Sequence, residues 1–460
     1  MTHIFNPTIL REYDIRGIVG QTLTRDDAYA LGRTYASLAG DEGARRVAVG
    51  RDGRLHSPEL ESALVEGLTK GGVEVVRIGV ASSPMLYFAA ATLDVQGGIQ
   101  VTGSHNPSEY NGFKLLLNGR SLFGEEIQQL GRRSAAGDWR DGEAIVRDTD
   151  VLGAYVDRLI QDFRGKPYRI GWDPGNGAAG PAVERLVATL PGEHFVIHSK
   201  IDGTFPAHHP DPTVEANLAD LKALVRDNAL DMGFAFDGDA DRIGAVDGQG
   251  RVLWGDQIMM LLAEPVLREL PGATIIADVK ASQVLFDRVA ELGGKPLMWK
   301  TGHSLIKSKM KETGAPIAGE MSGHIFFKHR WYGFDDALYA AVRLIEAVSE
   351  AGKSLIRLVD EMPKSVATPE LRFAVEEARK FAVVREVLGR LKAAGADVND
   401  VDGARVNTPD GWWLLRASNT QDVLVARAEA TDRAALDRLV AQLDEQLAKS
   451  GVKRTEAAAH

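Results

Sequence analysis

The sequence predicts a multidomain α/β protein, in which three related mixed α/β units precede a smaller C-terminal α+β unit. Three segments share one plan: a β-rich run, then a turn with glycine or aspartate, then a helical pattern. They cover residues 45–53, 168–175 and 273–280. Their spacing, about 100 residues or more, suits related domains rather than a solenoid repeat.

Each segment leads into an amphipathic stretch and a second predicted strand, at residues 74–78, 194–197 and 296–299. After Pro363 the pattern changes to that of an antiparallel sheet with two helices. Its predicted strands are 371–375, 403–406, 411–416 and 422–428, and its predicted helices are 378–392 and 432–449. The predicted domains are 1–150, 151–254, 255–363 and 364–460, and we expect a frayed tail from residue 451.

Composition narrows the class of protein. The 460 residues are 44% hydrophobic and 26% charged, which is ordinary for a protein with a full core. The net charge of −10, without a basic block, argues against nucleic-acid binding. The absence of cysteine excludes disulfides, thiolate catalysis and cysteine-ligated zinc. Without a signal-peptide pattern or a long apolar run, we expect a cytoplasmic protein that does not enter a membrane.

Residues 100–116 carry the strongest local signal for chemistry. A predicted strand enters the turn Thr102-Gly103-Ser104-His105-Asn106-Pro107, and the turn Asn111-Gly112 precedes Lys114. Glycine and Asn-Pro break the strand, so Ser104 is expected on a loop with its hydroxyl free. A hydroxyl beside an imidazole and near a lysine suits nucleophilic or phosphoryl chemistry, although an ordinary polar turn is equally compatible.

The run Asp237-Gly238-Asp239-Ala240-Asp241-Arg242 follows a predicted apolar strand. Three carboxylates at alternate positions can converge on one hard cation. An EF-hand loop is excluded, because its sixth and twelfth positions are occupied by Arg242 and Gly248. Three acids suit Mg²⁺, which takes its other ligands from phosphate and water, whereas the alternative is a solvated acidic turn.

Two further motifs receive no functional assignment. Residues 175–180 match G-x-G-x-x-G, but Asp173-Pro174 separates them from the strand and Pro181 opens the helix. A turn that packs a helix on a sheet explains them more simply than dinucleotide binding does. His208-His209-Pro210-Asp211-Pro212 offers metal-ligand types, but its prolines favour a connector.

Three short motifs indicate a function only when they are considered together. Arg16, in the run 12–17, can form a fork for phosphate, and Gly319-Glu320-Met321-Ser322-Gly323-His324 suits sugar hydroxyls. Arg416-Ala417-Ser418-Asn419-Thr420, between two predicted strands, offers cationic, hydroxyl and amide groups for a phosphate. Taken singly, each is also compatible with an ordinary polar turn.

In this order and at these intervals, the serine, aspartate, 319–324 and 416–420 motifs resemble those of the α-D-phosphohexomutases, specifically the bacterial phosphomannomutase/phosphoglucomutase group. The resemblance runs from Tyr13 to about Leu447, nearly the whole chain. It implies four domains around a central cleft. It also implies reversible transfer of phosphate between C1 and C6 of glucose or mannose phosphates, through phosphoserine and a hexose 1,6-bisphosphate.

The resemblance also implies a role for each motif. Ser104 would carry the phosphoryl group and, with Asp237, Asp239 and Asp241, hold Mg²⁺. His105, Lys114 and Arg242 would surround the transferring group. Tyr13, Arg16, Lys280 and His303 would line the cleft, some as general acid or base. The sugar would be read by Glu320, Met321, Ser322, Gly323 and His324. The phosphate that is not reacting would be gripped by Arg416, Ala417, Ser418, Asn419 and Thr420.

The implied partners are hexose phosphates, with glucose 1,6-bisphosphate as activator, and the implied state is a monomer or weak homodimer. Two positions depart from the family pattern: Ala240 stands where a second glycine is common, and Ala281-Ser282-Gln283 follows Lys280. The alternatives are a glucosamine or N-acetylglucosamine phosphate mutase and a non-catalytic sugar-phosphate-binding relative. A serine hydrolase is disfavoured, because Thr102 replaces the first glycine of G-x-S-x-G.

Overall fold

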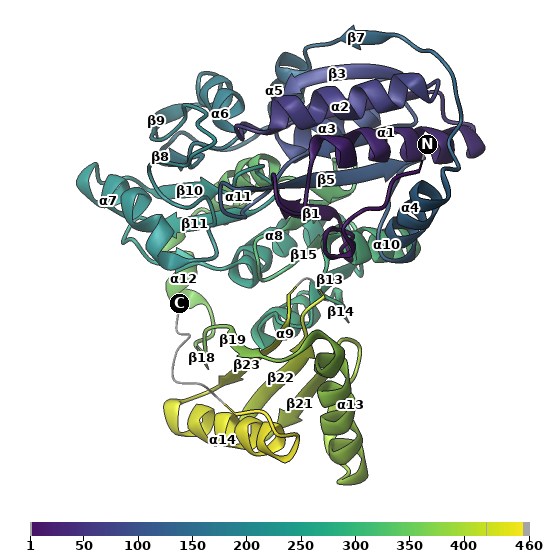
Figure 1. Cartoon of the computed structure of the whole chain (residues 1–460). Coiled ribbons are helices and arrows are strands. Elements are labelled where there is room, and N and C mark those ends of the chain that lie inside the picture. The colour runs from purple at the N-terminus through teal and green to yellow at the C-terminus, as the bar shows by residue number, and fades with distance from the viewer. Residues whose placement is uncertain (1, 420, 454–460) are drawn as a thin grey trace.

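The computed structural model describes residues 2–419 and 421–453, without the side chain of Glu377, and folds them into four units (Figure 1). Each unit is built on its own β-sheet. Among the described residues, no helix is long and apolar enough to cross a membrane.

The first unit has a mixed sheet in the order β1-β5-β4-β2-β3-β7, with β6 beside β5. Its strands are β1 (Ile15–Ile18), β2 (Arg46–Arg51), β3 (Glu74–Val80), β4 (Gly97–Val101), β5 (Tyr110–Leu117), β6 (Arg120–Ser121) and β7 (Val146–Asp148). Its helices are η1 (Pro7–Ile9), α1 (Arg25–Asp41), α2 (Ser57–Lys70), α3 (Ser83–Thr92) and α4 (Glu125–Ala136). Helix α1 begins at a capping box, in which the Thr24 side chain and Asp27 satisfy each other's backbone N–H groups.

The second unit has the strand order β12-β11-β10-β8-β9. Its strands are β8 (Tyr168–Asp173), β9 (Gly192–Val196), β10 (Met232–Phe236), β11 (Ile243–Asp247) and β12 (Val252–Leu253). Its helices are α5 (Leu152–Ile160), α6 (Gly180–Val187), η2 (Glu215–Leu218) and α7 (Ala219–Asp227).

The third unit has the strand order β14-β13-β15-β16-β17. Its strands are β13 (Thr274–Asp278), β14 (Lys295–Trp299), β15 (Ile317–Gly319), β16 (Ile325–Phe327) and β17 (Phe334–Asp335). Its helices are α8 (Gly255–Glu269), α9 (Gln283–Glu291), α10 (His303–Thr313), α11 (Ala337–Ala351) and α12 (Leu355–Glu361). Helix α11 is capped by Asp336, which accepts a hydrogen bond from the Tyr339 N–H, and it ends at Gly352 in the left-handed conformation.

These three units repeat one topology. In each, the first long strand (β2, β8 or β13) lies between two parallel neighbours, and one of those neighbours pairs antiparallel with the strand that follows it. The loops β4–β5, β10–β11 and β15–β16 therefore occupy the same place in each unit. The predicted fold class, three related α/β units and a smaller α+β unit, is confirmed.

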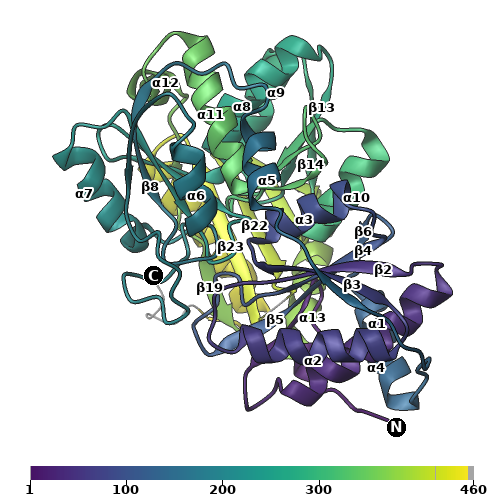
Figure 2. The ribbon, with the colours of Figure 1, turned by 90° about the horizontal axis from the view of Figure 1, so that it is seen from above.

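The C-terminal unit has an antiparallel sheet in the order β18-β23-β22-β21-β20, with β19 also paired to β23. Its strands are β18 (Val366–Ala367), β19 (Leu371–Ala374), β20 (Asp397–Asn399), β21 (Ala404–Thr408), β22 (Gly411–Ala417) and β23 (Val423–Ala430). Its helices are α13 (Glu377–Ala393) and α14 (Arg433–Lys449). Figure 2, seen from above, places β22 and β23 beneath the middle of the other three units.

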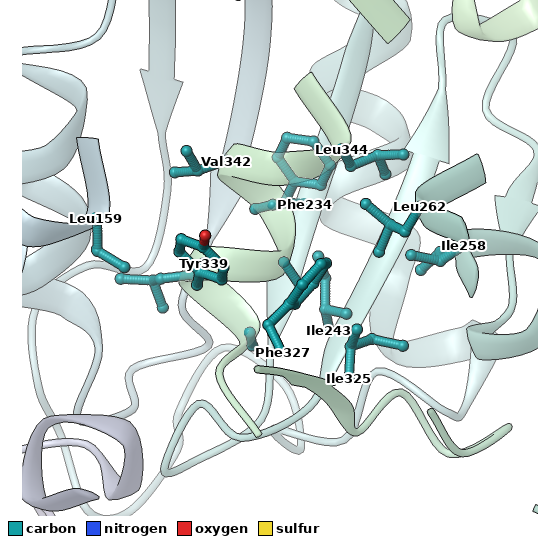
Figure 3. Close-up of a cluster of buried hydrophobic side chains, with 14 of the residues drawn as sticks. Leu159, Phe234, Ile243, Ile258, Leu262, Ile325, Phe327, Tyr339, Val342 and Leu344 are labelled. Carbon is teal, nitrogen blue, oxygen red and sulfur yellow. The ribbon is translucent and has the colours of Figure 1, made fainter. Parts of the chain in front are cut away.

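Each unit has its own sheet, but the hydrophobic clusters do not follow the same division into four. One large cluster of buried side chains runs through the first three units, from Ala48 to Leu355. Figure 3 shows part of it, where Phe234 and Ile243 of the second sheet lie near Leu262 of α8 and Phe327 of the third sheet. The C-terminal unit has a separate cluster around Trp413. The first unit also has a separate cluster, which includes Leu31 and Phe113. One cluster thus joins the first three units, while the fourth folds around its own and meets the third at a small apolar contact of Val279 with Trp412 and Leu414.

Candidate active site

Three of the predicted motifs lie in the equivalent loops at one edge of each sheet. Ser104 follows β4, Asp237 to Asp241 join β10 to β11, and Glu320 to His324 join β15 to β16. Backbone hydrogen bonds link the units here: the Ser83 N–H, at the start of α3, donates to the Asp239 carbonyl at 2.9 Å, and the Ile243 N–H donates to the Gly323 carbonyl at 3.0 Å. Arg242 and His324 form an isolated antiparallel bridge between the second and third units. The repeated topology therefore brings three distant motifs together.

Ser104 is held in an unusual conformation. Its φ of +50° lies in the left-handed region, and its side chain is buried. The Ser104 N–H donates to Thr102 Oγ1 at 2.9 Å, and Ser104 Oγ donates to Asp237 Oδ2 at 3.0 Å. His105 Nδ1 lies 3.2 Å from the same Oγ. The hydroxyl thus faces a carboxylate of the next unit.

Asp237, Asp239 and Asp241 form a compact carboxylate cluster. One oxygen from each lies within 4.8 Å of the others, and all three side chains are buried. Burial, followed by the two neighbouring aspartates, raises the pKa of Asp237 well above its ordinary value. Lys114 reaches the cluster from β5, with Nζ 2.6 Å from Asp239 Oδ2 and in contact with Asp241. Burial opposes charge on Lys114, but Asp239 and Asp241 outweigh it and raise the Lys114 pKa well above its ordinary value.

The cluster suits a divalent cation. Asp239 Oδ1 and Asp241 Oδ1 are buried and accept no hydrogen bond from any residue that the structure describes. Buried carboxylate oxygens without donors are costly unless a cation takes the donors' place. The arrangement, with oxygen ligands and one nearby serine hydroxyl, is that of a hard divalent metal ion.

The carboxylate loop has a second left-handed residue, Ala240, with φ +58°. Its methyl group is fully buried and belongs to the core shared by the first three units. Its carbonyl accepts the Ala337 N–H at 3.2 Å, at the start of α11. Position 240 therefore keeps a left-handed turn while packing a side chain.

Arg54 supports the serine loop and was missed by the sequence analysis. Its guanidinium is fully buried and donates to four backbone carbonyls at distances from 2.5 to 3.0 Å. The four carbonyls belong to Ser104, Asn106, Pro107 and Tyr110. Asp52 completes the support, accepting hydrogen bonds from Thr102 Oγ1 at 2.8 Å and the Gly103 N–H at 3.1 Å. The available signal was the Arg-Asp-Gly-Arg run directly after β2.

A chain of polar side chains orients His324. Arg242 Nε lies 3.0 Å from His324 Nε2, and His324 Nδ1 lies 2.9 Å from Asp335 Oδ2. Lys307 Nζ lies 3.4 Å from Asp335 Oδ1. Asp335 and Lys307 were also missed, because nothing in their own segments marks them. The nearby His303 has a pKa well below its ordinary value, chiefly because it is buried and secondly because Lys307 is close. At neutral pH, His303 is therefore uncharged.

The 319–324 loop is fixed from several sides. Glu320 accepts hydrogen bonds from the Gly302 N–H and from Ser322 Oγ, the latter at 3.2 Å. The Met321 N–H donates to Asp278 Oδ1 at 3.1 Å. Gly323 has φ +90°, and a Cβ there would lie 2.5 Å from the Ile243 carbonyl, so only glycine fits.

The groups of the C-terminal unit meet the others at Tyr13. Asn419 Nδ2 donates to Tyr13 Oη at 2.5 Å, and Tyr13 Oη donates to the Thr301 carbonyl at 2.8 Å. Arg416 Nε donates to Asp402 Oδ2 at 2.9 Å. Arg16 Nη1 donates to Asn106 Oδ1 at 3.1 Å, which places Arg16 beside the serine loop rather than beside Arg416.

At three predicted site positions, the structure gives less support for a binding role than the sequence did. Lys280 Nζ pairs with Glu370 Oε2 of the C-terminal unit at 3.2 Å, and Lys280 lowers the pKa of Glu370 to about 2. The Ala417 side chain packs into the core of the C-terminal unit and offers no polar group. Thr420 lies outside the described residues.

Comparison with known proteins settles the family. Models of the four phosphoglucomutase/phosphomannomutase domains match the chain in order: alpha/beta/alpha domain I at residues 7–141, domain II at 153–250, domain III at 254–366 and the C-terminal domain at 370–446. The chain belongs to the phosphoglucomutase/phosphomannomutase family. The expected place among the bacterial α-D-phosphohexomutases is thereby confirmed.

Individual family members are similar over nearly their whole length. A phosphomannomutase/phosphoglucomutase of Pseudomonas aeruginosa is 44% identical over 441 residues, covering 96% of this chain and 95% of the relative. A phosphoglucomutase of Neisseria gonorrhoeae is 45% identical over 436 residues, covering 94% and 95%. The crystal structure of a phosphoglucomutase/phosphomannomutase family protein from Burkholderia thailandensis superposes with a TM-score of 0.92 at 43% identity, covering 97% of this chain and 98% of that one.

Proposed function

We propose that this family member is a phosphoglucomutase/phosphomannomutase, an isomerase that moves phosphate reversibly between C1 and C6 of glucose and mannose phosphates. The observation that carries the proposal is the position of Ser104 Oγ, 3.0 Å from Asp237 Oδ2 at a buried three-carboxylate cluster. The names of the similar proteins, which specify glucose and mannose, support this substrate class.

In the proposed reaction, Ser104 is phosphorylated. The bond between Ser104 Oγ and phosphorus breaks as a sugar hydroxyl oxygen forms its bond to the same phosphorus, giving a hexose 1,6-bisphosphate. A neutral histidine takes the hydroxyl proton, a role that suits His303, and Ser104 Oγ gains a proton as it leaves, which restores the serine hydroxyl. The bisphosphate turns end over end, and Ser104 recovers the other phosphoryl group. Glucose 1,6-bisphosphate from solution would restore phosphoserine by the same exchange.

The cationic side chains are expected to stabilise the transferring group. Lys114 and Arg242 lie at the carboxylate cluster, and Arg16 lies at the serine loop. His105 Nδ1 also lies beside Ser104 Oγ, but burial, followed by Arg242, lowers its pKa well below the ordinary value, so it would act as a neutral hydrogen-bonding group. Asp237, Asp239 and Asp241, with a phosphate oxygen on Ser104, would hold Mg²⁺. When bound, Mg²⁺ would supply positive charge against the oxygens of the transferring phosphoryl group.

The remaining contacts would position the sugar. Glu320, Ser322 and His324 would bind its hydroxyls, while Arg416, Ser418 and Asn419 would grip the distant phosphate. We infer that the C-terminal unit closes over the substrate through this phosphate loop and excludes water, because hydrolysis of phosphoserine would inactivate the enzyme. Cytoplasmic location and a monomer or weak homodimer stay predictions.

The deciding experiment compares wild type with Ser104→Ala in coupled assays on glucose 1-phosphate and mannose 1-phosphate, with Mg²⁺ and a trace of glucose 1,6-bisphosphate. Loss of activity on both sugars is expected, because an alanine side chain has no hydroxyl to carry phosphate. Ser108→Ala, in the same loop, is the matched control and should keep activity. Undiminished turnover by Ser104→Ala would overturn the proposal. Turnover of glucosamine phosphate alone would favour the alternative mutase.

A further inference from the structure

The second unit contains a cluster of metal-ligand side chains separate from the carboxylates around Asp237. One ligand atom from each of Asp173, His198 and His208 lies within 4.8 Å of the others. Asp220, on α7, lies beside this group, with Oδ2 2.9 Å from His198 Nε2. The residues come from the end of β8, the loop after β9, the proline-containing connector and α7. The connector, which the sequence analysis left without a role, is thus one side of this cluster.

The hydrogen bond of His208 fits a metal-bound imidazole. Its Nδ1 lies 3.0 Å from the His209 carbonyl, so Nδ1 carries a proton and donates it. Its Nε2 lies 2.9 Å from Asp173 Oδ2. In neutral His208, two lone pairs would then face each other, and either a second proton or a metal ion is needed between them. A backbone carbonyl that fixes the tautomer while the other nitrogen binds metal is a common arrangement at zinc sites.

The equivalent aspartates of the other units show that Asp173 is the exception. Asp52, after β2, accepts from Thr102 Oγ1 and the Gly103 N–H, and Asp278, at the end of β13, accepts from Thr301 Oγ1 and the Met321 N–H. Each of these aspartates holds its own unit's functional loop through hydroxyl and N–H donors. Asp173 accepts the Gly175 N–H with Oδ1 but directs Oδ2 at an imidazole.

We propose that Asp173, His198 and His208 form a binding site for a divalent transition metal ion, with Zn²⁺ as the best match. Two imidazoles and one carboxylate, with water in the fourth position, suit tetrahedral Zn²⁺, whereas Mg²⁺ prefers oxygen ligands alone. The site is accessible for loading, since the side chain of His198 is 27% exposed.

Metal binding would fasten both ends of the loop that supports the serine turn. Between His198 and His208 lies Phe205, whose ring centroid is 5.0 Å from the Arg54 guanidinium carbon. Gly203 is equally close, since a Cβ there would lie 2.6 Å from Arg54 Cα. Arg54 in turn holds four carbonyls of the Ser104 loop. The ion would therefore tie β8 to the segment against which Arg54 packs.

The test is a Co²⁺ and Zn²⁺ titration of the full metal-free chain. Tetrahedral Co²⁺ with imidazole ligands gives strong visible absorption, whereas a carboxylate and water site gives weak bands, so the two sites are distinguishable. We expect two Co²⁺ per wild-type chain, strong absorption from one of them, and displacement by Zn²⁺. The strong absorption should persist in Asp239→Asn, which alters only the carboxylate cluster.

Two variants and one control decide the assignment. His198→Asn keeps a residue that tolerates the observed φ of +50° and should weaken the strongly absorbing site at least tenfold. His208→Ala should abolish it. His209→Ala, at an exposed neighbour whose side chain lies outside the cluster, should leave it unchanged. Strong absorption that survives in His198→Asn, or that never appears in wild type, would overturn the proposal. Circular dichroism of each metal-free variant shows whether it is folded.

Discussion

The two ends of the candidate active site lie on units whose hydrophobic cores are organised differently. The end that contains Ser104 lies on three units joined by one large hydrophobic cluster, and its loops are linked by backbone hydrogen bonds and buried ion pairs. The end that contains Arg416 lies on a unit with its own core. That unit meets the third through a small apolar cluster of Val279, Trp412 and Leu414 and through buried Arg405, which donates to the Val279 and Ala281 carbonyls at 2.7 and 2.8 Å.

We expect this difference to let the protein combine rigidity with motion. Hydrophobic cores are close-packed, so units joined by a large core move as one body, whereas a smaller contact with polar groups can be exchanged for water. In the proposed reaction, phosphoryl transfer requires fixed geometry at Ser104. Admission and rotation of the substrate would require an element that opens, and we expect the C-terminal unit, which has its own core, to be that element. The following predictions test this difference between the two ends of the candidate site.

The largest effect is expected for Arg54→Met, on the rigid side. The change leaves four buried carbonyls without their donor, and we expect unfolding free energy to fall by roughly 3–5 kcal/mol, as when a buried charged partner is removed. We also expect kcat to fall at least about tenfold, because the serine loop loses its position. Urea unfolding and the coupled assay measure both, and Arg54→Lys should restore part of kcat.

Arg25→Met on α1 is the matched control for Arg54→Met. Its side chain is half exposed and pairs with Glu66, so we expect a change of about 1 kcal/mol or less. If Arg54→Met unfolds and turns over like wild type, the serine loop does not depend on this guanidinium.

Arg416→Ala tests the mobile side. Hydrogen bonds to a charged group contribute about 1.5–3 kcal/mol, so KM for glucose 1-phosphate should rise roughly tenfold to hundredfold. We expect little change in the unfolding of the shared core, because Arg416 pairs within its own unit, with Asp402. Arg433→Ala, exposed on α14, should have wild-type KM. An unchanged KM for Arg416→Ala would mean that the C-terminal unit does not grip phosphate there.

The shared core also contains a carboxyl group that should make its stability depend on pH. Burial raises the pKa of Asp336 to about 7. Between about pH 4 and 7, native Asp336 holds a proton that the unfolded chain has lost, so rising pH destabilises the native state. Asp336→Asn removes this penalty. Relative to wild type, its unfolding free energy should therefore rise by roughly 2 kcal/mol from pH 5 to pH 8.

Urea unfolding at several pH values measures this difference. The matched control is Asp360→Asn, because Arg251 lowers the pKa of exposed Asp360, which is charged throughout this range. Its difference from wild type should not change with pH. A constant difference for Asp336→Asn as well would show that Asp336 is ionised in the native protein.

The smallest effect is expected for Tyr13→Phe, at the contact between the two sides. The hydroxyl joins Asn419 of the C-terminal unit to the Thr301 carbonyl, and a net hydrogen bond contributes about 0.5–1.5 kcal/mol. We therefore expect KM to change about two- to tenfold, with kcat altered less. Tyr29→Phe, whose hydroxyl accepts only a 3.3 Å hydrogen bond from Arg33, should match wild type. If Tyr13→Phe and Tyr29→Phe change KM equally, the Tyr13 hydroxyl has no specific role in domain closure.

The elements with strong local patterns were predictable from sequence. The three repeated units, the two C-terminal helices and the loops after β4, β10, β15 and β22 follow from hydrophobic periodicity and turn residues. Short edge strands such as β7, β18 and β20 were missed, because two or three residues carry no period, and their pairing depends on neighbours far along the chain.

Within the candidate site, the sequence indicated the groups that we propose to act, but it did not indicate the groups that hold them in place. Ser104 and the aspartates lie in motifs with a distinctive order of residue types. Arg54 lies in no such motif, since its four acceptors are 50 to 56 residues away. Lys307 and Asp335 are likewise 28 residues apart. Such partners become recognisable only when the fold brings them together.

Ala240 has a consequence for how the carboxylate loop meets its ion. A left-handed residue other than glycine costs about 1–2 kcal/mol, and here the buried methyl group offsets part of that cost through packing. The packing of the Ala240 methyl group thus sets the shape of the turn even without a bound ion. We expect cation exchange to be limited by the release of water from the incoming ion rather than by rearrangement of the loop. A larger ion such as Ca²⁺ would then be disfavoured, because the three carboxylates of the loop cannot move apart to surround it.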